Sequence, residues 1–290
     1  MSSPTDTLGV PKHAQRREVI IHAPSVTRLR LMVDFMNLLR YRDMLYTLSV
    51  HRIKVRYKQT VLGALWAILQ PLLIMLVFTL VFSLIVRMPS EGAPYAVFAY
   101  TALLPWTFFS TSLSSAANGL VSHSQLITKV YFPREILPLT YVIAALFDFL
   151  IASSILFALI LYYRVQLTLN ALYAIPIICI LAIFATAVSL FLSAFQVRFR
   201  DVGLAMPLVL QLWMYATPVV YPLAAVPSHL REIYALNPMV GIIESFRKVM
   251  IHNAAPDFKV LVSSAVISIL LLIVTYAYFK RMEATMADVI

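Results

Sequence analysis

Long apolar segments dominate the chain from residue 61 onward. A membrane-spanning helix needs about 20 mostly apolar residues, and six segments approach or exceed that length. We place them at about 61–86, 95–121, 136–163, 171–195, 204–221 and 259–279. This pattern predicts an all-α polytopic membrane protein with six transmembrane helices.

The residues before the first apolar segment follow a different pattern. Residues 1–28 are polar and contain three prolines, which is typical of a loosely held tail. From 29 to 58, apolar side chains recur at helical spacing with arginines between them. This indicates an amphipathic helix that lies in the membrane interface or in a groove of a partner protein. Residues 53–58 alternate with the period of a strand, but an isolated strand has no pairing partner, so we expect a helix or a short extended link.

The segment 222–258 is too long for a tight turn and too apolar for a solvated loop. Three prolines interrupt it, and its apolar run at 236–246 is too short to span a bilayer. We therefore expect interfacial or re-entrant helices before the last span. The chain then divides into a polar tail (1–28), an amphipathic cytoplasmic interface helix (29–58), a transmembrane domain (59–281) and a cytoplasmic C-terminal tail (282–290).

Composition and charge fix the class and predict an orientation. The chain is 61% hydrophobic and 12% charged, whereas a soluble domain carries roughly twice that charged fraction. Of 23 Lys and Arg residues, seventeen lie in residues 1–60, the loops 122–135 and 196–203, and the flank 280–281. The positive-inside rule then predicts that both termini are cytoplasmic. A basic segment can also bind nucleic acid, but a hydrophobic span follows this one directly, so we expect no nucleic-acid partner.

Motifs for catalysis or nucleotide binding are missing from the sequence. The six glycines are too far apart for a phosphate-binding loop or a dinucleotide-binding turn. A single cysteine, Cys179, allows no disulfide within the chain and no cysteine-based metal site. We therefore expect no cofactor, no metal and no enzymatic activity in this chain itself.

Two carboxylates, Asp148 and Glu244, fall at predicted membrane depth. A buried carboxylate is costly in a membrane, so structural hydrogen bonding inside the bundle or a proton relay would explain each one. Arg247 and Lys248 follow Glu244 at helical spacing and can pair with it. Aromatic residues gather near the span ends, where they form either an interfacial belt or the lining of a sugar-conducting pore. The candidates are Tyr95, Phe98, Tyr100, Trp106, Phe109, Trp213 and Tyr215.

The junction at 56–71, Arg-Tyr-Lys-Gln-Thr-Val-Leu-Gly-Ala-Leu-Trp-Ala-Ile-Leu-Gln-Pro, resembles the permease subunit of ABC-2-type polysaccharide exporters. These are the O-antigen, capsule and teichoic-acid exporters of bacteria. Four further segments match in family order, at 98–109, 126–134, 197–202 and 236–239. Together the matches cover about residues 35–250 and are most similar to the O-antigen branch.

The resemblance implies a homodimer that works with two copies of a separate ATPase subunit, which binds ATP and Mg²⁺. It implies a multi-pass protein of the bacterial inner membrane that exports a polysaccharide linked to polyprenyl diphosphate. A short gate helix is expected at about 122–134. Three alternatives stay open: an exporter of another glycopolymer such as teichoic acid, a glycosyltransferase or ligase for lipid-linked sugar, and a proton-coupled carrier.

Such a permease must receive work from its ATPase through its cytoplasmic surface. The expected coupling residues are Arg40, Arg42 and Arg52 of the interface helix and Arg198, Arg200 and Asp201 of a short loop. At the gate we expect Lys129 and Arg134 to receive the diphosphate and the aromatics Tyr131 and Phe132 to close a pore or stack on sugar. The alternative is that these cations only set the topology.

Overall fold

The computed structural model describes residues 40–58, 60–63, 65–130 and 132–289. The predicted tail 1–28 and the first part of the interface helix lie outside the described residues. The described part is all-helical and contains no strand, which confirms the predicted all-α class for this part of the chain. The period-two stretch forms the end of a helix up to Tyr57, and Lys58 is extended.

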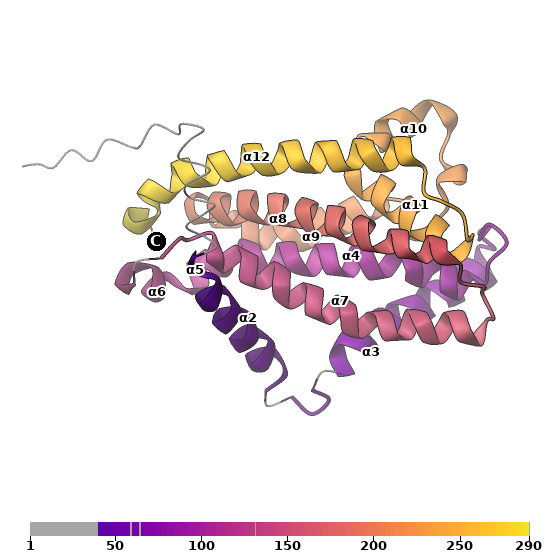
Figure 1. Cartoon of the computed structure of the whole chain (residues 1–290), viewed down its shortest axis with the longest axis horizontal. Helices are drawn as coiled ribbons and strands as arrows, with labels where there is room; N and C mark the ends of the chain where they lie inside the picture. Colours follow the sequence, from indigo (N-terminus) through magenta and orange to yellow (C-terminus); the bar gives the residue numbers. More distant parts are fainter. Residues whose placement is uncertain (1–39, 59, 64, 131, 290) are drawn as a thin grey trace, which may run out of the picture.

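An interface helix and six apolar helical segments form the bundle, which runs back and forth along one long axis (Figure 1). The interface helix is α2 (Arg42–Tyr57). The apolar segments are α3 (Leu65–Phe78) continued by the π-helical η1 (Thr79–Ile85), α4 (Tyr95–Ala117), α7 (Ile136–Tyr162), α8 (Ala174–Arg198), α9 (Asp201–Tyr215) and α12 (Phe258–Val289).

Short helices connect these segments at the two ends of the bundle. At the end where α2 begins lie α5 (Gly119–Ser122) and α6 (Ser124–Lys129), together with the C-terminal part of α12 (Figure 1). The connections at the opposite end contain η2 (Leu169–Tyr173), η3 (Leu223–Ala225), α10 (Ser228–Ala235) and α11 (Pro238–Ile251). Helix α12 continues through most of the segment predicted as a C-terminal tail.

Five helices of the described residues are long and apolar enough to cross a membrane, with lengths from 21 to 30 residues. The sixth predicted span corresponds to α9, which has 15 residues. A helix of that length rises about 22 Å, less than the roughly 30 Å of a bilayer core. The six-span topology and the re-entrant role of α10 and α11 therefore stay predictions.

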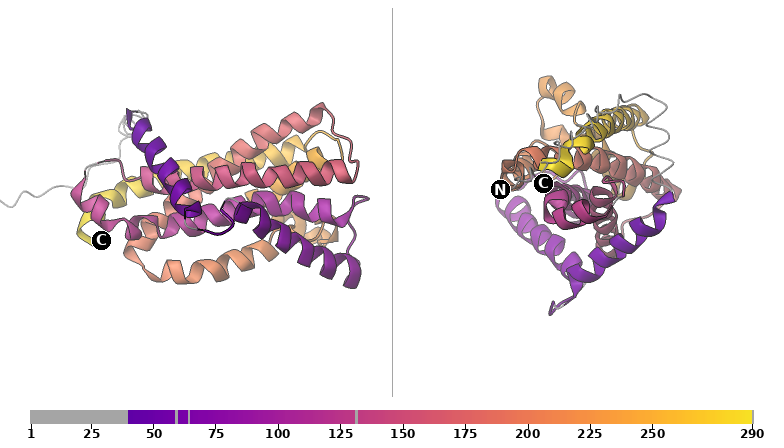
Figure 2. Two further views of the ribbon diagram at one scale, coloured as in Figure 1. Left: turned by 90° about the horizontal axis from the view of Figure 1, so that it is seen from below. Right: turned by 90° about the vertical axis from the view of Figure 1, so that its left-hand side faces the viewer.

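Helix α4 forms the centre of the bundle. In the most apolar 18-residue stretch of α4, 83% of the residues are buried. The helix packs against α3, α7, α8, α9 and α11. In the span formed by α3 and η1, only 11% of the residues in such a stretch are buried. The end-on view shows α2 and α3 as an outer layer on one side of the bundle (Figure 2). An apolar helix in this position suits contact with lipid or with another protein rather than a water-exposed surface.

A second, smaller core holds the end of the bundle at which α2 begins. Its buried members come from α5, α6, the start of α7, α8 and the C-terminal part of α12. They include Leu120, Ile127, Phe132, Ile136 and Phe279. The short helices α5 and α6 are therefore packed onto the long ones rather than projecting as a free loop.

The packing of α11 on α12 yields the first prediction. A Cβ atom added at Gly241 would overlap Ser264 Oγ and lie 3.1 Å from the main-chain oxygen of Val260, so the two helices approach closely only because this residue is glycine. Gly241→Leu should therefore destabilise the protein by about 1–3 kcal/mol, the usual cost of overpacking. Thermal unfolding in detergent measures the effect. Lys248→Leu, at an exposed position of the same helix, is the matched control. Equal unfolding temperatures for the two variants would contradict the close contact.

Candidate functional site

The interface helix α2 is attached to α7 at two points. At the first, Arg52 Nε donates a hydrogen bond of 2.7 Å to Thr140 Oγ1. The same guanidinium lies 3.4 Å from the centre of the Tyr141 ring, within the range of a cation–π interaction. Arg52 was expected to contact an ATPase, but in this structure its side chain contacts α7 of its own chain.

The second attachment point uses Asp148, one of the two carboxylates predicted at membrane depth. Arg56 forms an ion pair with Asp148, and the Tyr57 hydroxyl donates a hydrogen bond to the same carboxylate. Arg56 follows Arg52 by one helical turn, so both arginines lie on the same face of α2. The structure thus provides hydrogen bonding for Asp148. This pairing partner could not be predicted from sequence spacing, because Arg56 lies 92 residues from Asp148 along the chain.

A cavity of about 180 Å³ lies beside this ion pair, between α2, α3, α4 and α7. Its polar lining residues are Arg56, Tyr57, Gln70, Thr107, Thr111 and Asp148. The indole of Trp66 and the apolar side chains of Phe108 and Phe149 also line it. No sequence motif indicated this cavity, because it combines four helices that are far apart in the chain.

At the end of the bundle where α2 begins, a buried charged cluster joins the start of α7 to α12. Lys280 Nζ lies 2.8 Å from Glu135 Oε1 and 2.9 Å from Glu283 Oε2. The Tyr276 hydroxyl donates to Glu135 at 3.2 Å. Burial raises the pKa of the Glu135 carboxyl above its ordinary value, and the nearby Lys280 ammonium opposes this shift. No sequence pattern indicated this cluster, although Glu135 directly precedes a long apolar segment.

The predicted gate residues lie next to that cluster. Lys129 is exposed at the end of α6. Phe132 is buried in the smaller core, and Tyr131 lies outside the described residues. The main-chain N–H of Arg134 donates to Glu283 Oε1 at 3.1 Å, and its guanidinium donates to the Glu283 carbonyl oxygen at 2.5 Å. Arg134 therefore connects the gate segment to α12, while Lys129 is left as the exposed cation.

Five of the six residues proposed for ATPase coupling are exposed. They are Arg40 and Arg42 at the start of α2, and Arg198, Arg200 and Asp201 at the turn between α8 and α9. Both groups lie at the same end of the bundle (Figure 1). The side-chain amide of Gln196 supports the turn by donating to the Arg200 carbonyl oxygen at 3.0 Å and to the Asn118 side chain at 3.3 Å.

Most of the aromatic candidates for a pore lining lie in the main core around α4. Tyr95, Phe98, Tyr100, Trp106 and Phe109 are at most 6% exposed. The Phe109 ring stacks on Phe184 at 5.2 Å between ring centres and meets the edge of Trp213 at 5.0 Å. Only Tyr215, which is 49% exposed, and the half-buried Trp213 have ring surface available outside this core.

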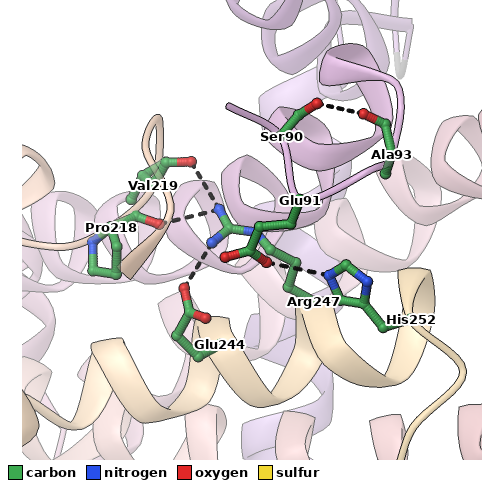
Figure 3. A network of polar contacts seen from close by, with 8 residues as sticks. All are labelled: Ser90, Glu91, Ala93, Pro218, Val219, Glu244, Arg247 and His252. Carbon is green, nitrogen blue, oxygen red and sulfur yellow. Dashed lines mark hydrogen bonds and ion pairs between the residues drawn. The ribbon is translucent and has the colours of Figure 1, made fainter. Parts of the chain in front are cut away.

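The second predicted carboxylate, Glu244, belongs to a network at the opposite end of the bundle (Figure 3). It pairs with Arg247 at 2.7 Å, as the spacing predicted, whereas Lys248 is exposed. Arg247 also donates to the carbonyl oxygens of Pro218 and Val219, at 3.1 Å each. Its guanidinium lies 3.8 Å from the centre of the Phe98 ring. This one buried side chain therefore joins α11, α4 and the segment that follows α9.

His252 and Glu91 add a further contact to the same network. The His252 ring lies 3.2 Å from the Glu91 carboxylate and connects the end of α11 to the loop between η1 and α4 (Figure 3). Glu91 has a positive φ of 53° and precedes Gly92, whose φ is 85°, so the loop makes a tight turn at this point. The network therefore holds the loop against the short helices.

The Glu135–Lys280 pair yields a prediction about stability. Removing Lys280 leaves the buried Glu135 without its cation, which typically costs about 3–5 kcal/mol, whereas removing Glu135 leaves Lys280 paired with Glu283 alone. Glu135→Gln and Lys280→Met should therefore each lower the unfolding temperature, and the double variant should be less destabilised than the sum of the two. Lys129→Met, which removes an exposed cation at the same end, is the control. Additive effects in thermal unfolding would contradict the pair.

Comparisons with known proteins identify the family of the chain. Residues 44–251 match the family described as the ABC-2 type transporter. The chain is 32% identical over 253 residues to an O-antigen export system permease protein of Myxococcus xanthus, covering 87% of this chain and 96% of that protein. It is 29% identical over 249 residues to the corresponding permease of Klebsiella pneumoniae, with 86% and 95% covered. A polysialic acid transport protein of Escherichia coli is 23% identical over 247 residues, with 82% and 93% covered. The chain therefore belongs to the ABC-2 type transporter family.

Proposed function

We propose that this chain is the membrane permease subunit of an ATP-driven exporter that moves a lipid-linked, O-antigen-like polysaccharide across the bacterial inner membrane. The observation that carries the proposal is the match to O-antigen export permeases over nearly their whole length. The sequence has no phosphate-binding loop, so ATP is hydrolysed on a separate ATPase subunit. We infer that two copies of the permease assemble with two copies of that subunit.

The end of the bundle that carries α2, α6 and the α8–α9 turn is the proposed cytoplasmic side. Seventeen of the 23 Lys and Arg residues lie in the segments that the positive-inside rule assigns to this side. The ATPase would contact the exposed residues Arg40, Arg42, Arg198, Arg200 and Asp201 there. Movement of α2 would reach the transmembrane helices through Arg52 and Arg56, because these arginines hold it to α7.

The substrate is inferred to be a glycan on polyprenyl diphosphate. Lys129 is the exposed cation proposed to receive the diphosphate, and Arg134 orders the gate segment through its bonds to Glu283. Trp213 and Tyr215 are the aromatic residues that retain ring surface for a pore lining. Export of another glycopolymer is a second candidate, supported by the similarity to a polysialic acid transport protein.

Co-expression with a neighbouring ATPase gene tests the proposed function. The permease should co-purify with the ATPase, and a membrane containing both proteins should export lipid-linked glycan. Hydrolysis by the complex should rise when lipid-linked glycan is added. An ATPase variant without its phosphate-loop lysine is the control and should abolish export. Export that continues with this variant would contradict an ATP-driven mechanism.

Charge reversal at the α8–α9 turn tests the coupling surface. Arg200→Glu together with Asp201→Arg should lower export at least about tenfold, since a correctly placed interface charge pair is worth roughly 1.5 kcal/mol or more. Membrane insertion and protein level should be unchanged because both side chains are exposed. Glu232→Arg, an exposed reversal at the opposite end, should export normally. Normal export and ATPase stimulation in the turn variant would exclude this loop from coupling.

A further inference from the structure

The cavity beside Asp148 is built from side chains repeated one helical turn apart on three helices. Helix α3 contributes Trp66 and Gln70, and α4 contributes Thr107 and Thr111. Helix α7 contributes Asp148 and Ala152, together with Ala145 and Phe149. Residues separated by four positions lie on one face of a helix, so each helix presents a continuous strip to the same space. The C-terminal end of α2 adds Arg56 and Tyr57 to this space.

Three alanines make room for the cavity, since Ala67, Ala145 and Ala152 line it on α3 and α7. Its volume of about 180 Å³ is well below the roughly 300–1,000 Å³ of sites for drug-sized ligands. The space therefore suits one ring-sized group rather than a long oligosaccharide.

Several polar side chains of the cavity lining have no hydrogen-bond partner among the described residues. In the part of the chain that the structure describes, the side chains of Gln70, Thr107 and Thr111 donate no hydrogen bond to protein atoms and accept none. Gln70 is exposed and lies five residues into the first candidate span. An amide without a partner is costly at membrane depth, where no water replaces the missing bonds. A ligand with several hydroxyl groups would supply them.

The charge of the cavity indicates which part of a lipid-linked glycan fits it, the diphosphate or a neutral sugar. Arg56 and Asp148 are paired with each other, so the two charges cancel. A diphosphate would need an excess of positive charge. A neutral group with donors and acceptors fits better, because it can bond to an amide, two hydroxyls and a carboxylate oxygen. Trp66, 48% exposed, offers an indole face against which the C–H groups of a sugar ring can pack.

We propose that this cavity binds a single neutral sugar ring of the lipid-linked glycan. The inference rests on the proposed function and names a site for its substrate that is separate from the gate segment. Thr107, Thr111, Gln70 and Trp66 are then the residues that hold the sugar.

Photo-crosslinking tests contact with the sugar directly. A benzophenone side chain replaces Gln70 in the full transporter, in membranes that contain polyprenyl-diphosphate-linked glycan with a radiolabelled sugar. The labelled glycan should become attached at this position but not at Leu76, which is exposed further along α3. Attachment only to phospholipid or to a second copy of the chain would overturn the proposal.

A second test compares a substitution that fills the cavity with the same kind of substitution outside it. Ala67→Phe should reduce the crosslink and lower export about tenfold, the effect of losing one or two hydrogen bonds to the ligand. Leu73→Phe places the same ring on α3 outside the cavity and should leave both unchanged. Equal crosslinking and export in these two variants would contradict the proposal.

Removing the threonine hydroxyls tests whether the cavity recognises the sugar by hydrogen bonds, because valine has nearly the same volume as threonine. Thr107→Val with Thr111→Val should also lower export about tenfold, whereas Ser154→Ala, an exposed hydroxyl elsewhere on α7, should not. Export by the wild-type complex distinguishes a failure of the sugar site from a failure of the proposed export function. If the wild type exports and every cavity variant does too, only the sugar site is wrong. If the wild type exports no glycan, the proposed function fails and the sugar site fails with it.

Discussion

The need to pair every charge inside an apolar bundle organises this protein. An isolated carboxylate or guanidinium among apolar helices costs far more than one in water. Each such group that the structure describes at depth is paired, and three of them also join separate elements of the chain. Asp148 holds α2 to α7, Glu135 holds the start of α7 to α12, and Arg247 holds α11 to the segment after α9. The hydrophobic contacts among long helices set their packing, whereas these pairs fix where the short helices attach.

The class of the protein and its helical segments could be predicted from the sequence, because runs of apolar residues have few other interpretations. The segments at 136–163 and 171–195 became α7 and α8 with ends within a few residues. The end of the segment predicted at 204–221 differs more: its helix ends at Tyr215, before Pro218 and Pro222. An apolar composition alone does not reveal where a helix ends. The local pair of Glu244 and Arg247 was predictable from its spacing.

The composition of the candidate sites was much harder to predict. Asp148 stood out as a charge in an apolar run, but its partners Arg56 and Tyr57 looked like ordinary members of a basic segment. Sequence spacing reports neighbours on one helix and says nothing about which helices cross. The aromatics of α4 show the same limit. Phe98 and Phe109 have the composition of a pore lining, yet both are buried because α4 is surrounded on all sides.

The two attachment points of α2 have a mechanical consequence. Arg52 and Arg56 are about 6 Å apart along α2, and their partners Thr140 and Asp148 are about 12 Å apart along α7. A helix pinned at one point can swivel around it, whereas a helix pinned at two points turns only if the second helix turns with it. A force on the exposed N-terminal end of the interface helix would therefore reach α7 through two contacts, Arg52 with Thr140 and Arg56 with Asp148.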